Sequence, residues 1–116
     1  MTNWMSGVCE ANGINIHYLR TGGRKRPLVL RHGLTGSGAC SIPFARALEG
    51  EYDVVMPDAR RHGNSSTPLN GHRYEDQASD VVGLIKGFGL AAPVLLGHSM
   101  GGMTVAVVAS QMVTAI

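Results

Sequence analysis

Gly97-His98-Ser99-Met100-Gly101-Gly102 is the part of this sequence from which the architecture is most readily inferred. The stretch has the form G-x-S-x-G and stands between two apolar runs, residues 93–96 and 103–109. This order predicts a buried strand, a sharp turn that projects the serine hydroxyl, and a buried helix. The outer glycines fit that geometry, because strand and helix approach closely on both sides of the serine. The competing interpretation is a tight glycine turn in which the serine has no role.

The residues upstream predict a hairpin and then separate strands. Alternating apolar and polar residues at 8–11 and 14–20 flank Asn12-Gly13, a pattern typical of a β-hairpin with a primed turn. Short apolar runs at 27–31 and 52–56 predict two more strands.

Helices are expected between these strands. Ser41 is expected to cap the first helix, with Pro43 in its first turn and Gly50 at its end. One apolar stripe at helical spacing predicts the second helix, which Gly87 or Gly89 is expected to end. The stripe consists of Ala78, Val81, Val82, Ile85 and Phe88. This alternation predicts an α/β domain with a mostly parallel sheet and an antiparallel N-terminal hairpin.

The bulk composition limits the classes of protein to which this chain can belong. The 116 residues suffice for one domain, and contents of 44% hydrophobic and 16% charged residues are typical of globular chains. The net charge of +2 gives no expectation of nucleic-acid binding, and Arg24, Lys25 and Arg26 are expected to form a solvated turn. Cys9 and Cys40 match no disulfide framework or metal-ligand spacing. No secretory signal or membrane span is expected, so a cytoplasmic location away from membranes is predicted.

A second motif, His32-Gly33-Leu34, follows a predicted strand. In a parallel sheet, this loop and the turn at Ser99 leave the same carboxyl edge, where ligands bind. The backbone N–H groups of Met100 and Leu34 are therefore expected to face a developing oxyanion. The residues beside these donors that are expected to contact the substrate are Gly33 and His98.

A third motif, Asp58-Ala59-Arg60-Arg61-His62-Gly63-Asn64-Ser65, also follows a predicted strand. The three motifs together, in this order, resemble the N-terminal half of an α/β-hydrolase-fold protein, over nearly the whole chain. The resemblance implies that residues 1–116 are a partial hydrolase domain. It also implies that Ser99 is the nucleophile and that Met100 and Leu34 form the oxyanion hole.

The nucleophile restricts the chemistry that the resemblance implies. Serine rather than aspartate at position 99 argues against the dehalogenase and epoxide-hydrolase branches. It favours hydrolysis of esters, lactones, thioesters or carbon–carbon bonds, with a small acyl compound as the substrate. Non-haem perhydrolases share the same motifs.

The sequence departs from the family in two places. Arg61 stands where the family usually has glycine, and a left-handed conformation there would cost arginine roughly 1–2 kcal/mol. The family places its catalytic acid and histidine after the nucleophile, whereas no Asp, Glu or His follows Ser99 in this sequence. We therefore expect a truncated or split serine hydrolase that is nearly inactive alone, because its serine lacks a base.

Other residues are poor substitutes for that base. His98 adjoins the nucleophile and is expected to point away from it. Asp58 is expected to order its loop through Arg60 or backbone N–H groups, whereas Asp76 and Asp80 are expected to be solvated. The remaining histidines are expected to pack in loops, as His32 and His62, or to lie at the surface, as His17 and His72.

Two other classes of function stay open. An exposed edge at the strand 93–96 and a partly uncovered last helix would favour an interaction module that forms a homodimer, a swapped assembly or a complex with a C-terminal fragment. A nucleotide- or flavin-binding domain is the third hypothesis. No Gly-Lys-Ser/Thr follows the loop at His32, and the glycines at 36 and 38 fit a dinucleotide fingerprint poorly. No cofactor and no metal is expected.

Overall fold

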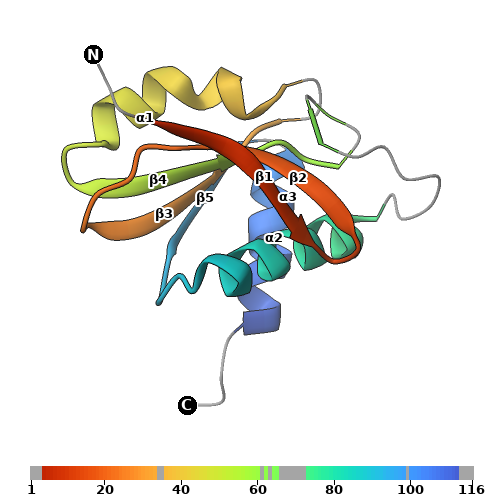
Figure 1. The fold of residues 1–116 in the computed structure, drawn as a ribbon. Coiled ribbons are helices and arrows are strands. Elements are labelled where there is room, and N and C mark those ends of the chain that lie inside the picture. The colour runs from red at the N-terminus through yellow and green to blue at the C-terminus, as the bar shows by residue number, and fades with distance from the viewer. Residues whose placement is uncertain are drawn as a thin grey trace.

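The computed structural model describes residues 4–33, 36–60, 62, 64–65, 73–98 and 100–112, without the side chains of Met100 and Met112. Strands and helices alternate along it as the sequence predicts (Figure 1). A short 3₁₀ helix, Gly38–Ser41, precedes α1. The other elements are β1 (Met5–Ala11), β2 (Ile14–Arg20), β3 (Arg26–Arg31), α1 (Ile42–Leu48), β4 (Tyr52–Pro57), α2 (Tyr74–Phe88), β5 (Val94–Gly97) and α3 (Met100–Met112).

The strands form one sheet in the order β1-β2-β4-β3-β5. β2 is antiparallel to both β1 and β4, whereas β3 is parallel to both β4 and β5. The turn between β1 and β2 has positive φ at Asn12 (51°) and at Gly13 (77°), as a type I′ turn requires. The structure therefore confirms the α/β fold and its antiparallel N-terminal hairpin.

The central strands are buried on both faces, because α1 covers one side of the sheet and α2 and α3 cover the other (Figure 1). Successive residues of a strand point to opposite faces, so each strand contributes to two cores. The core under α1 contains Leu28, Leu30, Ala45, Val54 and Met56. The cores under α2 and α3 contain Val29, Ala78, Val81, Ile85 and Val108 in one cluster and Ala11, Ile16, Val55 and Leu84 in another. The apolar stripe predicted for α2 thus faces the sheet.

The helix ends differ in detail from the prediction. Ser41 occupies the N-cap position of α1, but its side chain makes no capping hydrogen bond. Gly89, with a φ of 64°, ends α2 in the left-handed conformation that favours glycine. Of the two glycines expected at the end of this helix, Gly89 is therefore the one that ends it.

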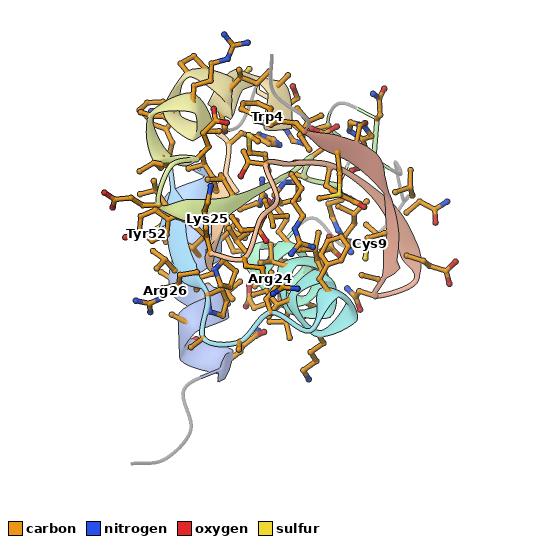
Figure 2. The ribbon with its side chains drawn as sticks, turned by 60° about the vertical axis from the view of Figure 1, so that its left-hand side comes forward. Trp4, Cys9, Arg24, Lys25, Arg26 and Tyr52 are labelled. Carbon is orange, nitrogen blue, oxygen red and sulfur yellow. The ribbon has the colours of Figure 1, made fainter. Side chains whose placement is uncertain are left out.

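The basic cluster lies at the surface, as expected. Arg24 and Lys25 lie in the turn before β3, Arg26 is the first residue of that strand, and all three are exposed (Figure 2). The Nζ of Lys25 donates a hydrogen bond of 2.6 Å to the backbone oxygen of Glu49. The indole of Trp4 donates to the carboxylate of Glu49 at 3.2 Å.

Within the described part of the chain, no helix has the length and apolar character needed to cross a membrane.

Candidate active site

Strands β3 and β5 lie side by side and end together. They pair in parallel, with Arg31 opposite Gly97 at the last step of the ladder. The loop that begins at His32 and the turn that begins at His98 therefore leave the same edge of the sheet, as the sequence predicts. A cavity of about 240 Å³ opens between them, and Gly33 and His98 both line it.

The walls of this cavity are largely apolar. Phe44 of α1 and Leu96 of β5 line it and are 63% and 42% exposed, so both present apolar surface to a ligand. Cys40 and Ser41, from the 3₁₀ helix, complete the side nearest α1. A concave apolar surface with few polar groups is typical of sites that bind small organic molecules.

The chain reverses sharply between β5 and α3. The backbone N–H of His98 donates to the carbonyl oxygen of Arg31 at 3.1 Å, and the N–H of Gly101 donates to the carbonyl oxygen of His98 at 2.9 Å. These bonds hold the end of β5 against the start of α3, which begins at Met100. The first N–H groups of a helix have no partner within it and form a site for negative charge. The predicted nucleophile Ser99 and the predicted donor Leu34 both lie outside the described residues.

Two glycines permit this turn, as the sequence predicts. A methyl group on Gly97 would overlap the carbonyl group of Gly101, and a methyl group on Gly101 would overlap the carbonyl oxygens of Arg31 and His32. Gly102 is different, because the nearest atom to an added Cβ there is 3.5 Å away. The strand, the turn and the helix can therefore meet only with glycine at 97 and 101.

His32 joins two loops at the edge of the sheet. Its Nε2 accepts a hydrogen bond of 2.9 Å from the backbone N–H of Ala59, and its Nδ1 lies 2.6 Å from the carbonyl oxygen of Gly33. Nδ1 therefore carries the proton. Burial lowers the pKa of His32 to about 4, so the ring is neutral at pH 7. The loop-packing role predicted for His32 is confirmed.

Asp58 orders the loop that follows β4. Its carboxylate accepts hydrogen bonds from the backbone N–H groups of Gly38 at 2.5 Å and Asn64 at 3.0 Å. The prediction of backbone donors is thus confirmed, whereas Arg60 pairs with another carboxylate. His17 Nδ1 lies 2.9 Å from Asp58 Oδ2, and the His17 side chain is 20% exposed, so its expected surface position is wrong.

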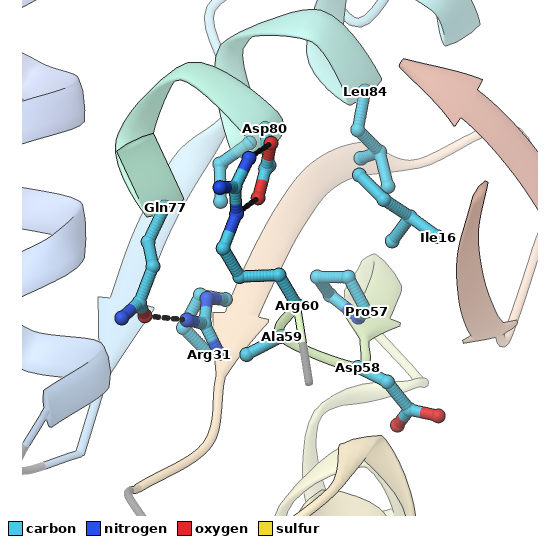
Figure 3. A pocket seen from close by; sticks show the side chains of 10 residues that line it. Ile16, Arg31, Pro57, Asp58, Ala59, Arg60, Gln77, Asp80 and Leu84 are labelled. Carbon is cyan, nitrogen blue, oxygen red and sulfur yellow. Dashed lines mark hydrogen bonds and ion pairs between the residues drawn. The ribbon is translucent and has the colours of Figure 1, made fainter. Parts of the chain in front are cut away.

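The expectation that Asp80 is solvated is also wrong. Arg60 reaches Asp80 through Nε at 2.6 Å and Nη2 at 2.7 Å, and both side chains are under 10% exposed (Figure 3). The apolar pattern of α2 gave no sign that a loop arginine would cover this face. Asp76, at the start of α2, accepts a hydrogen bond of 3.1 Å from the backbone N–H of Arg73.

Sequence reasoning also missed a buried guanidinium beneath the site. Arg31 is 1% exposed, and burial lowers its pKa to about 10. Its Nη2 donates to Oε1 of Gln77 at 2.8 Å, whereas Nη1 has no hydrogen-bond partner among the described residues (Figure 3). A cavity of about 10 Å³ beside Arg31 and Asp80 has room for roughly one water molecule. In the sequence, the only sign of this buried guanidinium was a charged residue at the end of an apolar strand.

Comparison with known proteins places the chain in a large family. A family model described as the alpha/beta hydrolase fold matches residues 26–116.

In the part of the chain that the structure describes, no group of three or more His, Cys, Asp or Glu side chains could hold a metal ion.

The relatives are hydrolases of differing chemistry. N-formylmaleamate deformylase of Pseudomonas putida is 39% identical over 97 residues, which are 82% of this chain and 36% of the deformylase. A soluble epoxide hydrolase of Corynebacterium sp. is 35% identical over 91 residues, 78% of this chain and 32% of that enzyme. The crystal structure of an enol-lactonase from Burkholderia xenovorans matches with a TM-score of 0.86 at 29% identity, over 91% of this chain and 42% of that one. The chain spans less than two fifths of the length of these curated relatives.

Proposed function

Because this chain belongs to the α/β-hydrolase fold family, we propose that it supplies the nucleophile and oxyanion hole of a serine hydrolase that cleaves carboxylic ester-type bonds. One observation supports this proposal above the others: Gly97 and Gly101 allow β5 to turn directly into α3 at the edge where β3 ends. We infer that a serine between these elements stands close to the N–H groups at a helix start, which is the environment that a nucleophilic serine needs.

In the proposed reaction, the hydroxyl oxygen of Ser99 attacks the carbonyl carbon of an ester, lactone or thioester. The N–H groups of Met100 and Leu34 donate to the oxygen that becomes negatively charged. The alcohol or thiol leaves, and water then releases the acid from the acyl-enzyme. The substrate's apolar part would rest against Phe44 and Leu96 in the cavity of about 240 Å³.

The base must come from another segment. His32 is neutral, but the Ala59 N–H occupies its Nε2 and Nδ1–H points at Gly33, so neither nitrogen is available to Ser99. No Asp, Glu or His follows Ser99 in these 116 residues. We therefore propose that a histidine and an acid from a separate segment, packed beside β5 and α3, complete the site.

The relatives include an epoxide hydrolase as well as a deformylase and a lactonase. Ester-type chemistry is preferred here because a serine at position 99 forms an acyl-enzyme by attack on a carbonyl carbon. Epoxide turnover by a carboxylate nucleophile is not available to this residue.

The experiment restores the remainder of the fold. The chain is fused to the part of the Burkholderia lactonase that follows the aligned region, and p-nitrophenyl acetate hydrolysis is measured. We expect the fusion to exceed the chain alone, and Ser99→Ala to lower kcat by at least about 10³-fold. Ser110→Ala is the matched control, since that exposed hydroxyl bonds only the Val107 carbonyl among the described groups. A folded fusion that is inactive, or that keeps its activity after Ser99→Ala, would contradict the proposal.

A second function is favoured by the position of β5 at the edge of the described sheet. An exposed parallel edge is a template for pairing with another strand. Leu96 at this edge is 42% exposed and Met103 on α3 is 54% exposed, so apolar surface accompanies the free edge. The proposed role is an assembly module that forms a homodimer through β5. Sedimentation that gives a monomer at high concentration would contradict it, and a dimer that Met103→Glu dissociates would support it.

A further inference from the structure

Three side chains outside the candidate active site form a serine–histidine–aspartate series. The hydroxyl of Ser6 lies 3.1 Å from Nε2 of His17, and Nδ1 of His17 lies 2.9 Å from Oδ2 of Asp58. Neither the cavity at Gly33 nor the proposed reaction of Ser99 involves these groups. The distances are those of hydrogen bonds between a nucleophile, a base and the group that orients the base.

The sheet brings the three residues together from distant parts of the sequence. Ser6 on β1 is opposite Leu19, and Val8 is opposite His17, so Ser6 and His17 are diagonal neighbours on one face of the hairpin. β2 pairs in turn with β4, and the backbone N–H of Asp58 donates to the carbonyl oxygen of His17 at 2.8 Å. The arrangement therefore follows from strand register.

The loop after β4 holds the base and the acid in place. The backbone N–H of His17 donates to Oγ of Ser65 at 2.9 Å, and that hydroxyl donates to the carbonyl oxygen of Asp58 at 2.8 Å. Gly38 and Asn64 donate to the Asp58 carboxylate. These hydrogen bonds fix the positions of His17 and Asp58 relative to each other.

The hydrogen bonds also decide which nitrogen of His17 carries the proton. Burial raises the pKa of Asp58, but the backbone donors Asn64 and Gly38 and the His17 ring outweigh burial and lower it. The ionised carboxylate only accepts hydrogen bonds, so Nδ1 of His17 must be the donor to it. In the neutral ring, Nε2 then has the lone pair that can accept the proton of Ser6, which is the arrangement that a general base requires.

We propose that Ser6 is a second reactive serine, acylated by activated esters of small carboxylic acids, with His17 as its base and Asp58 as the positioning residue. Oγ of Ser6 bonds to the carbonyl carbon while its proton passes to Nε2 of His17. The carbon–oxygen bond to the leaving group then breaks, and His17 returns the proton to the departing phenolate or to water. The products are an ester on Ser6 and a phenol.

Accessibility favours this reaction. Ser6 is exposed on β1, so an ester can approach its hydroxyl. The Asp58 side chain is 5% exposed, so its charge is little screened by water where it faces the imidazolium that forms. The proposed reaction is stoichiometric acylation of Ser6 rather than rapid turnover.

The test uses the 116-residue chain with Ser99→Ala, which separates this proposal from the proposed function. The protein is treated with p-nitrophenyl acetate, and acetylated peptides are identified by mass spectrometry. We expect acetylation of Ser6 at least about 100-fold faster than of the exposed Ser110, a preference in the range that general-base catalysis supplies. His17→Gln should lower the rate at Ser6 by a similar factor, and Ser6→Ala should remove one equivalent of rapidly released nitrophenolate.

Two outcomes would overturn the proposal. One is acetylation of Ser6 no faster than of Ser110 in the otherwise unchanged chain, a comparison that needs no change at the triad. The other is an unchanged rate at Ser6 in a His17→Gln protein that circular dichroism shows to be folded. Either result leaves the role of Ser99 untouched.

Discussion

The guanidinium of Arg31 donates to the side-chain oxygen of Gln77 at 2.8 Å, in the layer between the sheet and helices α2 and α3. Arg31 stands at the last step of the β3–β5 ladder, directly beneath the turn at His98. Arg31 is 1% exposed, and its hydrogen bond to Gln77 therefore links the end of β3, next to the candidate site, to α2.

Removing one partner of this pair should cost more than removing both. Gln77→Leu leaves the buried Arg31 without its acceptor, and we expect a loss of about 2–3 kcal/mol in the free energy of unfolding. Adding Arg31→Met should recover most of that loss, because both partners are then apolar. Urea denaturation of the two single variants and the double variant measures the coupling. Additive losses would show that the hydrogen bond is energetically irrelevant.

The glycines of the turn provide a matched pair of substitutions. Gly101→Ala should destabilise the fold by about 3 kcal/mol, because its methyl group meets the backbone of Arg31 and His32. Gly102→Ala should be stabilising by about 0.5–1 kcal/mol, because alanine is the better helix former and its Cβ has room. Thermal denaturation distinguishes them, and equal effects of the two changes would contradict the close approach at Gly101.

The stability of the fold should fall strongly when one charge of the buried ion pair of Arg60 and Asp80 is removed. Asp80→Ala leaves Arg60 buried without its carboxylate, and we expect a loss of about 3–5 kcal/mol. Glu75→Ala is the control, since Glu75 pairs with Arg73 at an exposed position and its loss should not change the stability measurably. Urea denaturation of both variants checks the contrast.

The neutral imidazole of His32 predicts a particular pH dependence. Burial lowers its pKa to about 4 in the folded chain, whereas an unfolded histidine has a pKa of about 6.5. Between these values the unfolded chain binds the proton first, so stability is complete above about pH 6.5 and falls as the pH falls towards 4. His32→Asn should reduce the difference in unfolding free energy between pH 7.5 and 4.5. An unchanged difference would contradict the assignment.

The sequence predicted those features that depend on near neighbours. The spacing of Gly97 and Gly101 predicted a close approach, and Asn12-Gly13 predicted the hairpin turn, because each depends on local backbone geometry. The pairs of Arg60 with Asp80 and of His17 with Asp58 were missed. Their partners lie on different elements, and only the strand register and the path of the loop after β4 bring them together.

The hypothesis that Ser99 attacks the substrate is tested most directly by the intermediate itself. The fusion with the lactonase segment is mixed with p-nitrophenyl acetate, quenched with acid during the first turnover, digested and mapped by mass spectrometry. We expect an acetyl group on the peptide that contains Ser99, formed and lost at the rate of turnover. Turnover without any acetyl group on that peptide, with the label elsewhere or nowhere, would contradict it.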